Sequence, residues 1–161
     1  RWDPLEIVSS PVLRAVQTAG LLAEQLSVQG QVRSVSGLVE FDMGQWEERR
    51  VSELRGQKAW EDYLEFPEQT HFPGGESMQG IQQRAVRCVN ALLAQTTAAG
   101  LVCVTHGGIV RLLVLAAYGA PLSSYHRSSV PTGSMSVIRL RPGGRPVVRC
   151  VGVTGDTGRD W

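Results

Sequence analysis

The sequence lacks the features that mark membrane and nucleic-acid-binding proteins. None of its apolar runs approaches the length needed to span a bilayer. Its 16 basic and 15 acidic side chains leave a formal net charge of only +1, so no long-range field favours nucleic acid or a membrane surface. A charged ligand must therefore be bound by a local cluster of side chains.

Cysteine and histidine are scarce. The three cysteines, at positions 88, 103 and 150, are an odd number without CxxC spacing, which indicates reduced thiols in a cytoplasmic protein. The three histidines, at positions 71, 106 and 126, form no recognisable metal-ligand pair. No GxGxxG or Walker-type loop is present to bind a pyrophosphate, which disfavours a dinucleotide-binding domain. We expect neither a metal nor a cofactor.

The most informative stretch runs from Leu101 to Leu113. An uncharged segment rich in β-branched residues reaches a polar break at residues 105–108, and an apolar periodic segment follows at once. This pattern predicts a buried strand, a tight turn and a helix. His106 would then lie at the carboxyl end of a strand beside a helix N-terminus, a favourable place for an anion. The alternative is a strand-end histidine whose ring is satisfied by backbone groups.

The same pattern occurs near the beginning of the sequence. Residues 5–9 form a short β-prone run that stops at Ser9-Ser10-Pro11, and helical spacing of apolar residues extends from Val12 to about Leu26. Arg14 therefore lies in the first helical turn, where a cation interacts unfavourably with the helix dipole. That position indicates a functional role; an ordinary solvated arginine is the alternative.

Residues 37–47 mix acids, glycines and large apolar groups without a clear period, as structured functional loops do. Glu40 is flanked by apolar residues, and such surroundings raise the pKa of a carboxyl group, which suits a general acid near neutral pH. An exposed loop glutamate is the alternative. Three further carboxylates compete for the role: Asp42, Glu47 and Glu48.

The alternation of strands and helices predicts one α/β domain, a three-layer α/β/α sandwich around a mostly parallel sheet. Further helices are predicted at residues 51–58, 60–66 and 78–95, and a further strand at residues 31–35. Two C-terminal strands, at residues 135–140 and 146–153, are predicted to form an antiparallel hairpin through a turn at 141–145. Because ligands bind at the carboxyl ends of parallel strands, Arg14 and His106 are expected at one edge.

Four stretches now combine in a recognisable order. They are Ser9-Ser10-Pro11-Val12-Leu13-Arg14, then Leu38-Val39-Glu40 with Gly44-Gln45-Trp46-Glu47, then Pro73-Gly74-Gly75-Glu76-Ser77 followed by Arg84, and finally Val104-Thr105-His106-Gly107-Gly108. With these stretches the chain resembles the histidine phosphatase superfamily, in its phosphoglycerate mutase-like branch. The first and last stretches together are a specific indication of this family, whereas Gly-Glu-Ser alone would be a weak one.

The resemblance implies a role for each candidate residue. Arg14 would hold the phosphoryl group through charge-assisted hydrogen bonds. Glu40 would protonate the leaving oxygen and then activate water. His106 would bind phosphoryl oxygens and stabilise the charge of the transition state, and the backbone around Gly107 would complete the cradle. The expected partner is a small phosphorylated metabolite, and the expected location is the cytoplasm. Whether the protein forms a homodimer is left open.

One departure from the family is large. The family's nucleophile is a histidine in an Arg-His-Gly motif at the end of the first strand, and this sequence contains no Arg-His-Gly. His106 follows Thr105 and matches the family's second histidine. The sequence also begins with Arg1 rather than methionine, so we expect residues 1–161 to be an N-terminally incomplete domain whose nucleophile lies upstream. A degenerate paralogue is the alternative.

The length of the segment between Glu40 and His106 narrows the choice of activity within the family. Relatives that act as mutases carry longer insertions between the acid/base glutamate and the second histidine, whereas the segment from Glu40 to His106 is compact, which favours a phosphatase. Phosphoglycerate mutase activity and a non-catalytic phosphate-binding or interaction domain are the alternatives. Residues 49–72 would choose the substrate. Their neighbourhood holds aromatic residues that line either a pocket wall or the core: Trp46, Trp60, Tyr63 and Phe72.

Overall fold

A computed structural model describes residues 4–28, 31–140 and 144–155. Its central feature is a parallel sheet with the strand order β2-β1-β3. Strands β1 (Leu5–Ser9) and β3 (Gly100–Val104) pair along their whole length, with Ser9 opposite Val104. Strand β2 (Arg33–Ser34) is shorter than the predicted 31–35. The carboxyl ends of β1 and β3 therefore lie side by side.

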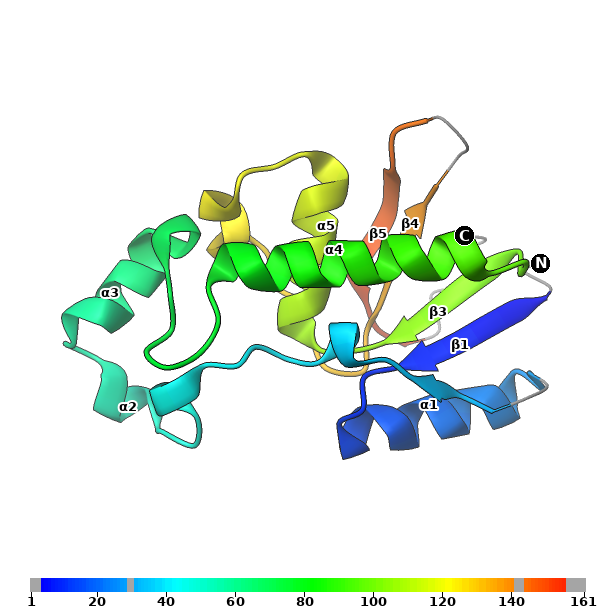
Figure 1. The fold of residues 1–161 in the computed structure, drawn as a ribbon, viewed down its shortest axis with the longest axis horizontal. Helices are drawn as coiled ribbons and strands as arrows, with labels where there is room; N and C mark the ends of the chain where they lie inside the picture. Colours follow the sequence, from blue (N-terminus) through cyan, green and yellow to red (C-terminus); the bar gives the residue numbers. More distant parts are fainter. Residues whose placement is uncertain (1–3, 29–30, 141–143, 156–161) are drawn as a thin grey trace.

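Two helices cover the faces of this sheet, as the sequence predicts (Figure 1). Helix α1 (Leu13–Gln25) packs on β1 and β3 through its buried alanines, Ala15 and Ala19. On the other face, the C-terminal half of α4 (Met78–Gln95) packs against Val8 of β1. Successive residues of β1 point to opposite faces of the sheet, so β1 can pack against α1 on one face and against α4 on the other.

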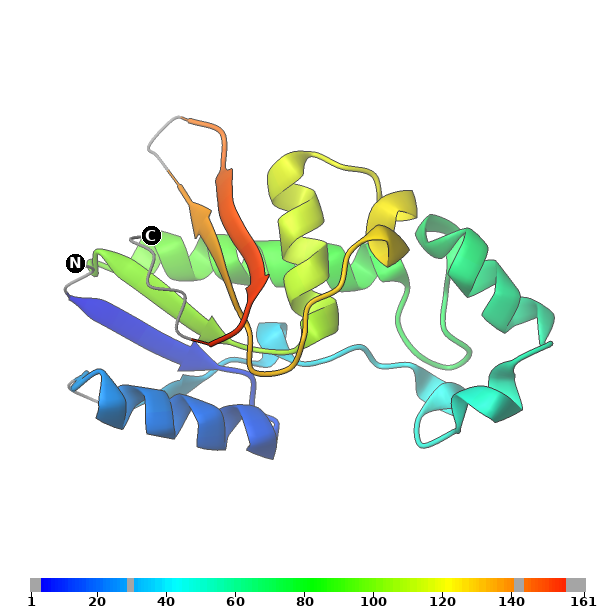
Figure 2. The same ribbon diagram turned by 180° about the vertical axis from the view of Figure 1, so that it is seen from behind.

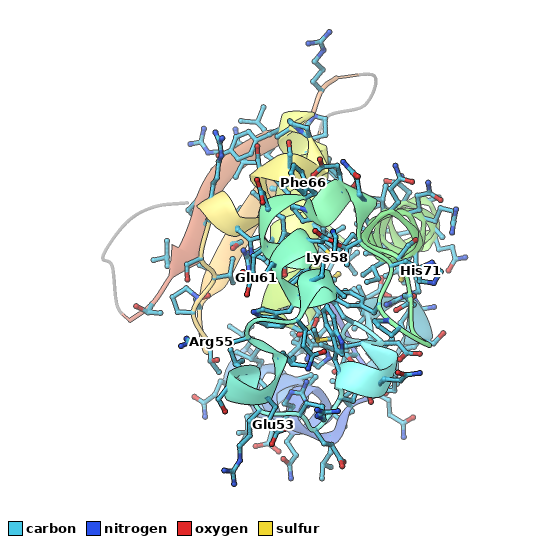
Figure 3. All side chains as sticks on the ribbon, turned by 90° about the vertical axis from the view of Figure 1, so that its left-hand side faces the viewer. Glu53, Arg55, Lys58, Glu61, Phe66 and His71 are labelled. Atoms are coloured by element: carbon cyan, nitrogen blue, oxygen red, sulfur yellow. The ribbon has the colours of Figure 1, made fainter. Side chains whose placement is uncertain are left out.

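A second core lies beyond the sheet, where α5 (Gly107–Tyr118) meets the first half of α4. Helices α2 (Val51–Leu54) and α3 (Lys58–Glu65) close its outer side. Gly56, at a φ of +80°, lies between them, so the first ends before the predicted residue 58 and the second begins before the predicted residue 60. The predicted aromatic residues form this core rather than a pocket wall: Trp46, Trp60, Tyr63 and Phe72 are all at most 9% exposed. Charged residues, including Glu53, Lys58 and Glu61, cover its outer surface (Figure 3).

The C-terminal strands β4 (Met135–Arg139) and β5 (Val147–Val153) form the predicted antiparallel pair. They make a separate two-stranded sheet beside α5, visible from behind in Figure 2. The predicted turn falls partly on residues 141–143, outside the described residues. Among the described strands none lies between β3 and β4, so β3 is paired along one edge only. The prediction of a layered α/β fold is confirmed, with its sheet in two parts.

Four short 3-10 helices complete the described secondary structure: Ser36–Leu38, Gly44–Trp46, Pro67–Gln69 and Leu122–Arg127. The first two flank Glu40, so the segment that carries this residue has defined turns on both sides. No helix in the described ranges is long and apolar enough to cross a membrane.

Candidate active site

The ends of β1 and β3 bring the first and last motifs of the sequence together. The backbone N–H of Ser10 donates to the carbonyl oxygen of Val104 at 2.8 Å, which ties the two strand ends to each other. Arg14 follows in the first turn of α1, and His106 immediately precedes α5. Residues 92 positions apart in sequence thus meet at one edge of the sheet.

His106 is hydrogen-bonded through both ring nitrogens. Nη2 of Arg14 lies 2.9 Å from Nδ1 of His106, and Oγ of Ser10 lies 2.8 Å from Nε2 of His106. A guanidinium group can only donate, so Nδ1 accepts from Arg14 and the ring proton is on Nε2, which donates to Ser10. His106 is therefore a neutral imidazole in this arrangement, and the alternative of a ring satisfied by backbone groups is wrong.

The surroundings keep His106 neutral. Its side chain is only 6% exposed, and this burial, together with the positive charge of Arg14, lowers its pKa below the ordinary value. Arg14 itself is exposed and makes no ion pair with the described carboxylates. An anion placed between Arg14 and His106 would offset the unpaired positive charge of Arg14 and accept a hydrogen bond from the imidazole, so this corner favours an oxyanion.

The start of α5 adds backbone donors to this corner. Its N-cap residue, His106, makes no side-chain capping bond, and the first turn contains no acidic residue. The free N–H groups at the positive end of the helix are suited to phosphate. A side chain at Gly108 would place its Cβ 2.8 Å from Oε1 of Glu40 and 2.9 Å from the ring of Phe41, whereas at Gly107 the nearest atom would be the carbonyl oxygen of Val130, at 3.2 Å.

Glu40 lies against this glycine pair. Its Oε1 accepts from the backbone N–H of Phe41 at 3.1 Å. Burial raises the pKa of Glu40 above its ordinary value, against smaller opposing effects from the backbone N–H groups of Phe41 and Gly108 and the charges of Arg14 and Arg84. A half-buried carboxyl group with a raised pKa can hold a proton where an exposed one could not.

The competing carboxylates are placed differently. Asp42 is exposed, and its Oδ1 accepts from the backbone N–H of Gly44 at 2.9 Å, so it stabilises a turn. Glu47 and Glu48 are exposed. Sequence reasoning missed Ser10, which is fully buried and holds His106. The only sequence signal for it was its position in the Ser-Ser-Pro motif.

The described residues contain no group of three or more His, Cys, Asp or Glu side chains that could hold a metal ion. Cys88, Cys103 and Cys150 are free thiols. The groups that the described residues bring to the site are an arginine, an imidazole, a carboxyl group and backbone N–H groups. Together these groups can bind a tetrahedral oxyanion and transfer a proton beside it.

Comparison with known proteins finds relatives that are named phosphatases. The chain is 29% identical over 158 residues to an acid phosphatase of Mycobacterium tuberculosis, covering 97% of the chain and 70% of that protein. It is 32% identical over 136 residues to a glucosyl-3-phosphoglycerate phosphatase of Mycolicibacterium vanbaalenii, covering 76% of the chain but 57% of that protein. The chain thus spans between about half and three quarters of the length of these relatives.

The fold is matched by solved structures. The crystal structure of the α-ribazole phosphatase from Shigella flexneri superimposes with a TM-score of 0.78 at 23% identity, over 96% of this chain and 76% of that one. A sequence profile matches residues 1–152, and it describes the histidine phosphatase superfamily (branch 1). The chain belongs to that superfamily.

Proposed function

We propose that this protein is a phosphomonoester hydrolase that acts through a phosphohistidine intermediate. The observation that carries the proposal is the convergence of Arg14, His106 and Glu40 at the carboxyl ends of β1 and β3, beside the open N-terminus of α5. The names of the relatives support the same class of reaction, since one is an acid phosphatase and the other a glucosyl-3-phosphoglycerate phosphatase.

In the proposed reaction, Arg14 and His106 bind the non-bridging oxygens of the phosphoryl group. The Arg14 guanidinium leaves Nδ1 of His106 and donates to the phosphoryl group instead, whose negative charge offsets the Arg14 charge that, after burial, lowers the pKa of His106. The backbone N–H groups at the start of α5 add donors. These interactions strengthen as negative charge develops on the oxygens in the transition state.

Glu40 supplies the proton in the first step and removes one in the second. A histidine nitrogen attacks phosphorus, the P–O bond to the ester oxygen breaks, and protonated Glu40 gives its proton to the leaving oxygen. The Glu40 carboxylate then takes a proton from water, whose oxygen attacks phosphorus and releases phosphate and the free histidine. The raised pKa of Glu40 supports the protonated form needed at the start.

The nucleophile is not among the three histidines of this sequence. His106 is held by Arg14 and Ser10, and no histidine of the chain stands in an Arg-His-Gly motif. We place it on a strand N-terminal to Arg1 that would pair with the open edge of β3, parallel to β3. The carboxyl end of such a strand would lie beside His106, because parallel strands end at the same edge.

Turnover of p-nitrophenyl phosphate tests this assignment. The 161-residue chain is expected to show no hydrolysis above background, and the same chain carrying an N-terminal segment with Arg-His-Gly is expected to be active. Replacement of the added histidine by alanine is the matched control and should abolish the gain. Hydrolysis by the 161-residue chain alone would contradict the proposal.

A second candidate is a phosphate-binding domain without catalytic activity. The observation that favours it is the pairing of Arg14 with His106, which suffices to bind an oxyanion without a nucleophile. In that case the extended chain would bind phosphate without turnover. Mutase activity is less favoured because the segment between Glu40 and His106 is compact. The substrate is proposed to be a small phosphorylated metabolite.

A further inference from the structure

Arg84 and Glu76 form the most extensively bonded ion pair of the described residues. The Nε and Nη2 of Arg84 donate to Oε1 and Oε2 of Glu76 at 2.9 and 2.8 Å, so that two parallel hydrogen bonds join the planar groups. The side chains are 21% and 29% exposed. Such a forked, half-buried pair fixes the orientation of both groups, unlike a contact between two exposed charges.

The rest of the Arg84 guanidinium is directed at the segment that carries Glu40. Its Nη1 donates to the carbonyl oxygens of Gly37 and Val39 at 3.1 and 3.0 Å, and its Nη2 donates to the carbonyl oxygen of Glu40 at 3.4 Å. Together with the two bonds to Glu76, these contacts use all five N–H groups of an arginine. A lysine, with one nitrogen, could not reproduce them.

Glu76 holds the same segment on the other side of Glu40. Its Oε2 accepts from the backbone N–H of Asp42 at 3.2 Å, and its own N–H donates to the Asp42 carbonyl oxygen at 2.9 Å. The backbones of Gly75 and Asp42 approach each other closely, because a Cβ at Gly75 would lie 2.2 Å from the carbonyl oxygen of Asp42. The pair thus binds the backbone before, at and after Glu40.

We propose that Arg84 and Glu76 are positioning residues for Glu40: they fix the backbone of residues 37–42 and thereby the place of the carboxyl group beside Gly108. The inference rests on the proposed role of Glu40 as the acid/base. It goes beyond that role because neither Arg84 nor Glu76 contacts the reacting groups. Each acts through Glu40.

The pKa of Glu40 distinguishes a positioning role of Arg84 and Glu76 from simple packing, because it responds to the charges around Glu40. Arg14 on α1 and Arg84 on α4 both lower its pKa. Burial raises the pKa of Tyr63 on α3 and of Tyr125 after α5, and the charge of Glu40 makes a smaller contribution in the same direction to each. Removing the Arg84 charge should therefore raise the pKa of Glu40, whereas removing the Glu76 charge uncovers Arg84 and should lower it.

The experiment compares Arg84→Met, Glu76→Gln and Arg84→Lys in the 161-residue chain. The control is Arg33→Met, which breaks the Arg33–Glu6 pair (3.1 Å); Arg33 lines the same surface hollow as Arg84 but is not among the charges acting on Glu40. Carboxyl carbon NMR follows the titration of Glu40, and hydrogen exchange follows the amides of residues 39–42.

We expect the pKa of Glu40 to rise in Arg84→Met and to fall in Glu76→Gln. Amide exchange in residues 39–42 should accelerate by at least about tenfold in both, because charge-assisted hydrogen bonds are lost. Arg84→Lys, the variant that carries the test if Arg84→Met does not fold, should accelerate exchange while shifting the titration less. The control should change neither. Unchanged exchange, or pKa shifts of the same sign, would overturn the inference.

Binding of inorganic phosphate separates this inference from the proposed function. Phosphate affinity, which depends on Arg14 and His106, should change by less than about threefold in the Arg84 and Glu76 variants, well within the effect of one weak contact. If the unaltered chain binds no phosphate, the proposed function fails while the exchange and titration results still decide the role of Arg84 and Glu76. A large loss of phosphate affinity in these variants would contradict a role confined to Glu40.

Discussion

The two halves of the site are built very differently. The segment around Glu40 is held by Arg84 and Glu76 on one side, and by Thr105 on the other, whose Oγ1 donates to the Leu38 carbonyl oxygen at 2.7 Å. Arg14, in contrast, is exposed, and its guanidinium makes one side-chain hydrogen bond, to His106. The half of the candidate site around Glu40, the proposed acid, is thus pre-organised within the described chain, whereas the half proposed to bind phosphate is open.

This difference follows from where each half lies in the sheet. Glu40 sits over the second core, where α4, α5 and the aromatic residues pack together. Arg14 follows the carboxyl end of β1 and His106 that of β3, and the outer edge of β3 has no partner among the described strands. Glu40 is already held in place, whereas Arg14 is not. A bound ligand or a further strand would therefore order the half proposed to bind phosphate more than the half around Glu40.

The largest expected effect comes from breaking the phosphate half. Arg14→Ala should weaken binding of inorganic phosphate roughly 10- to 100-fold, because hydrogen bonds to a charged group are lost. Isothermal titration calorimetry measures the change. Arg49→Ala is the matched control, since Arg49 is an exposed arginine paired with Glu53 at 2.9 Å. Equal losses in the two variants would show that phosphate binding does not depend on the Arg14 corner.

A second change tests how tightly the acid half is packed. Gly108→Ala places a methyl group against Glu40 and Phe41, and we expect a loss of about 1–3 kcal/mol in the free energy of unfolding. Gly20→Ala is the control in another helix, where a Cβ would meet nothing within 4 Å, and it should stabilise by about 0.5–1 kcal/mol. Urea denaturation measures both. A stabilising Gly108→Ala would mean that Glu40 is not held there.

The smallest expected effect concerns the charge of Glu40. Burial raises its pKa, so the unfolded chain loses this proton at a lower pH than the folded chain does, and stability falls as pH rises from the ordinary pKa through the raised one. Glu40→Gln removes this loss and should stabilise the protein at neutral pH by about 1 kcal/mol or less. The gain should vanish below about pH 4, where both side chains are neutral.

Urea denaturation at both pH values checks this, with Glu48→Gln as the control because Glu48 is exposed. A gain for Glu40→Gln that is the same at both pH values would mean that the carboxyl group does not carry a raised pKa. A gain for Glu48→Gln would point to the net charge of the chain instead.

The sequence predicted the local structure well and the long-range contacts poorly. Apolar periodicity indicated α1, β3 and α5, because each buries one face against its neighbours. The meeting of Arg14 with His106 was predictable, since both follow parallel strands. The bond from Ser10 to His106 was not, because nothing in a Ser-Ser-Pro motif specifies a partner 96 residues away.

The same limit applies to the rest of the chain. Arg84 falls within the helix predicted at residues 78–95, yet its contacts with residues 37–40 depend on how α4 crosses the loop. The separation of β4 and β5 from the parallel sheet was also missed. Hydrophobic patterning specifies that a strand is buried, and it does not specify which strand lies beside it.

The most direct test of the account is to trap the phosphorylated intermediate. The chain with an added N-terminal Arg-His-Gly segment is mixed with p-nitrophenyl phosphate, quenched in alkali, where phosphohistidine survives, and mapped by mass spectrometry. We predict one phosphoryl group, on the added histidine, with the intermediate accumulating in Glu40→Gln, which cannot activate water. A phosphoryl group on His106, or an active protein that forms no phosphohistidine, would contradict the account.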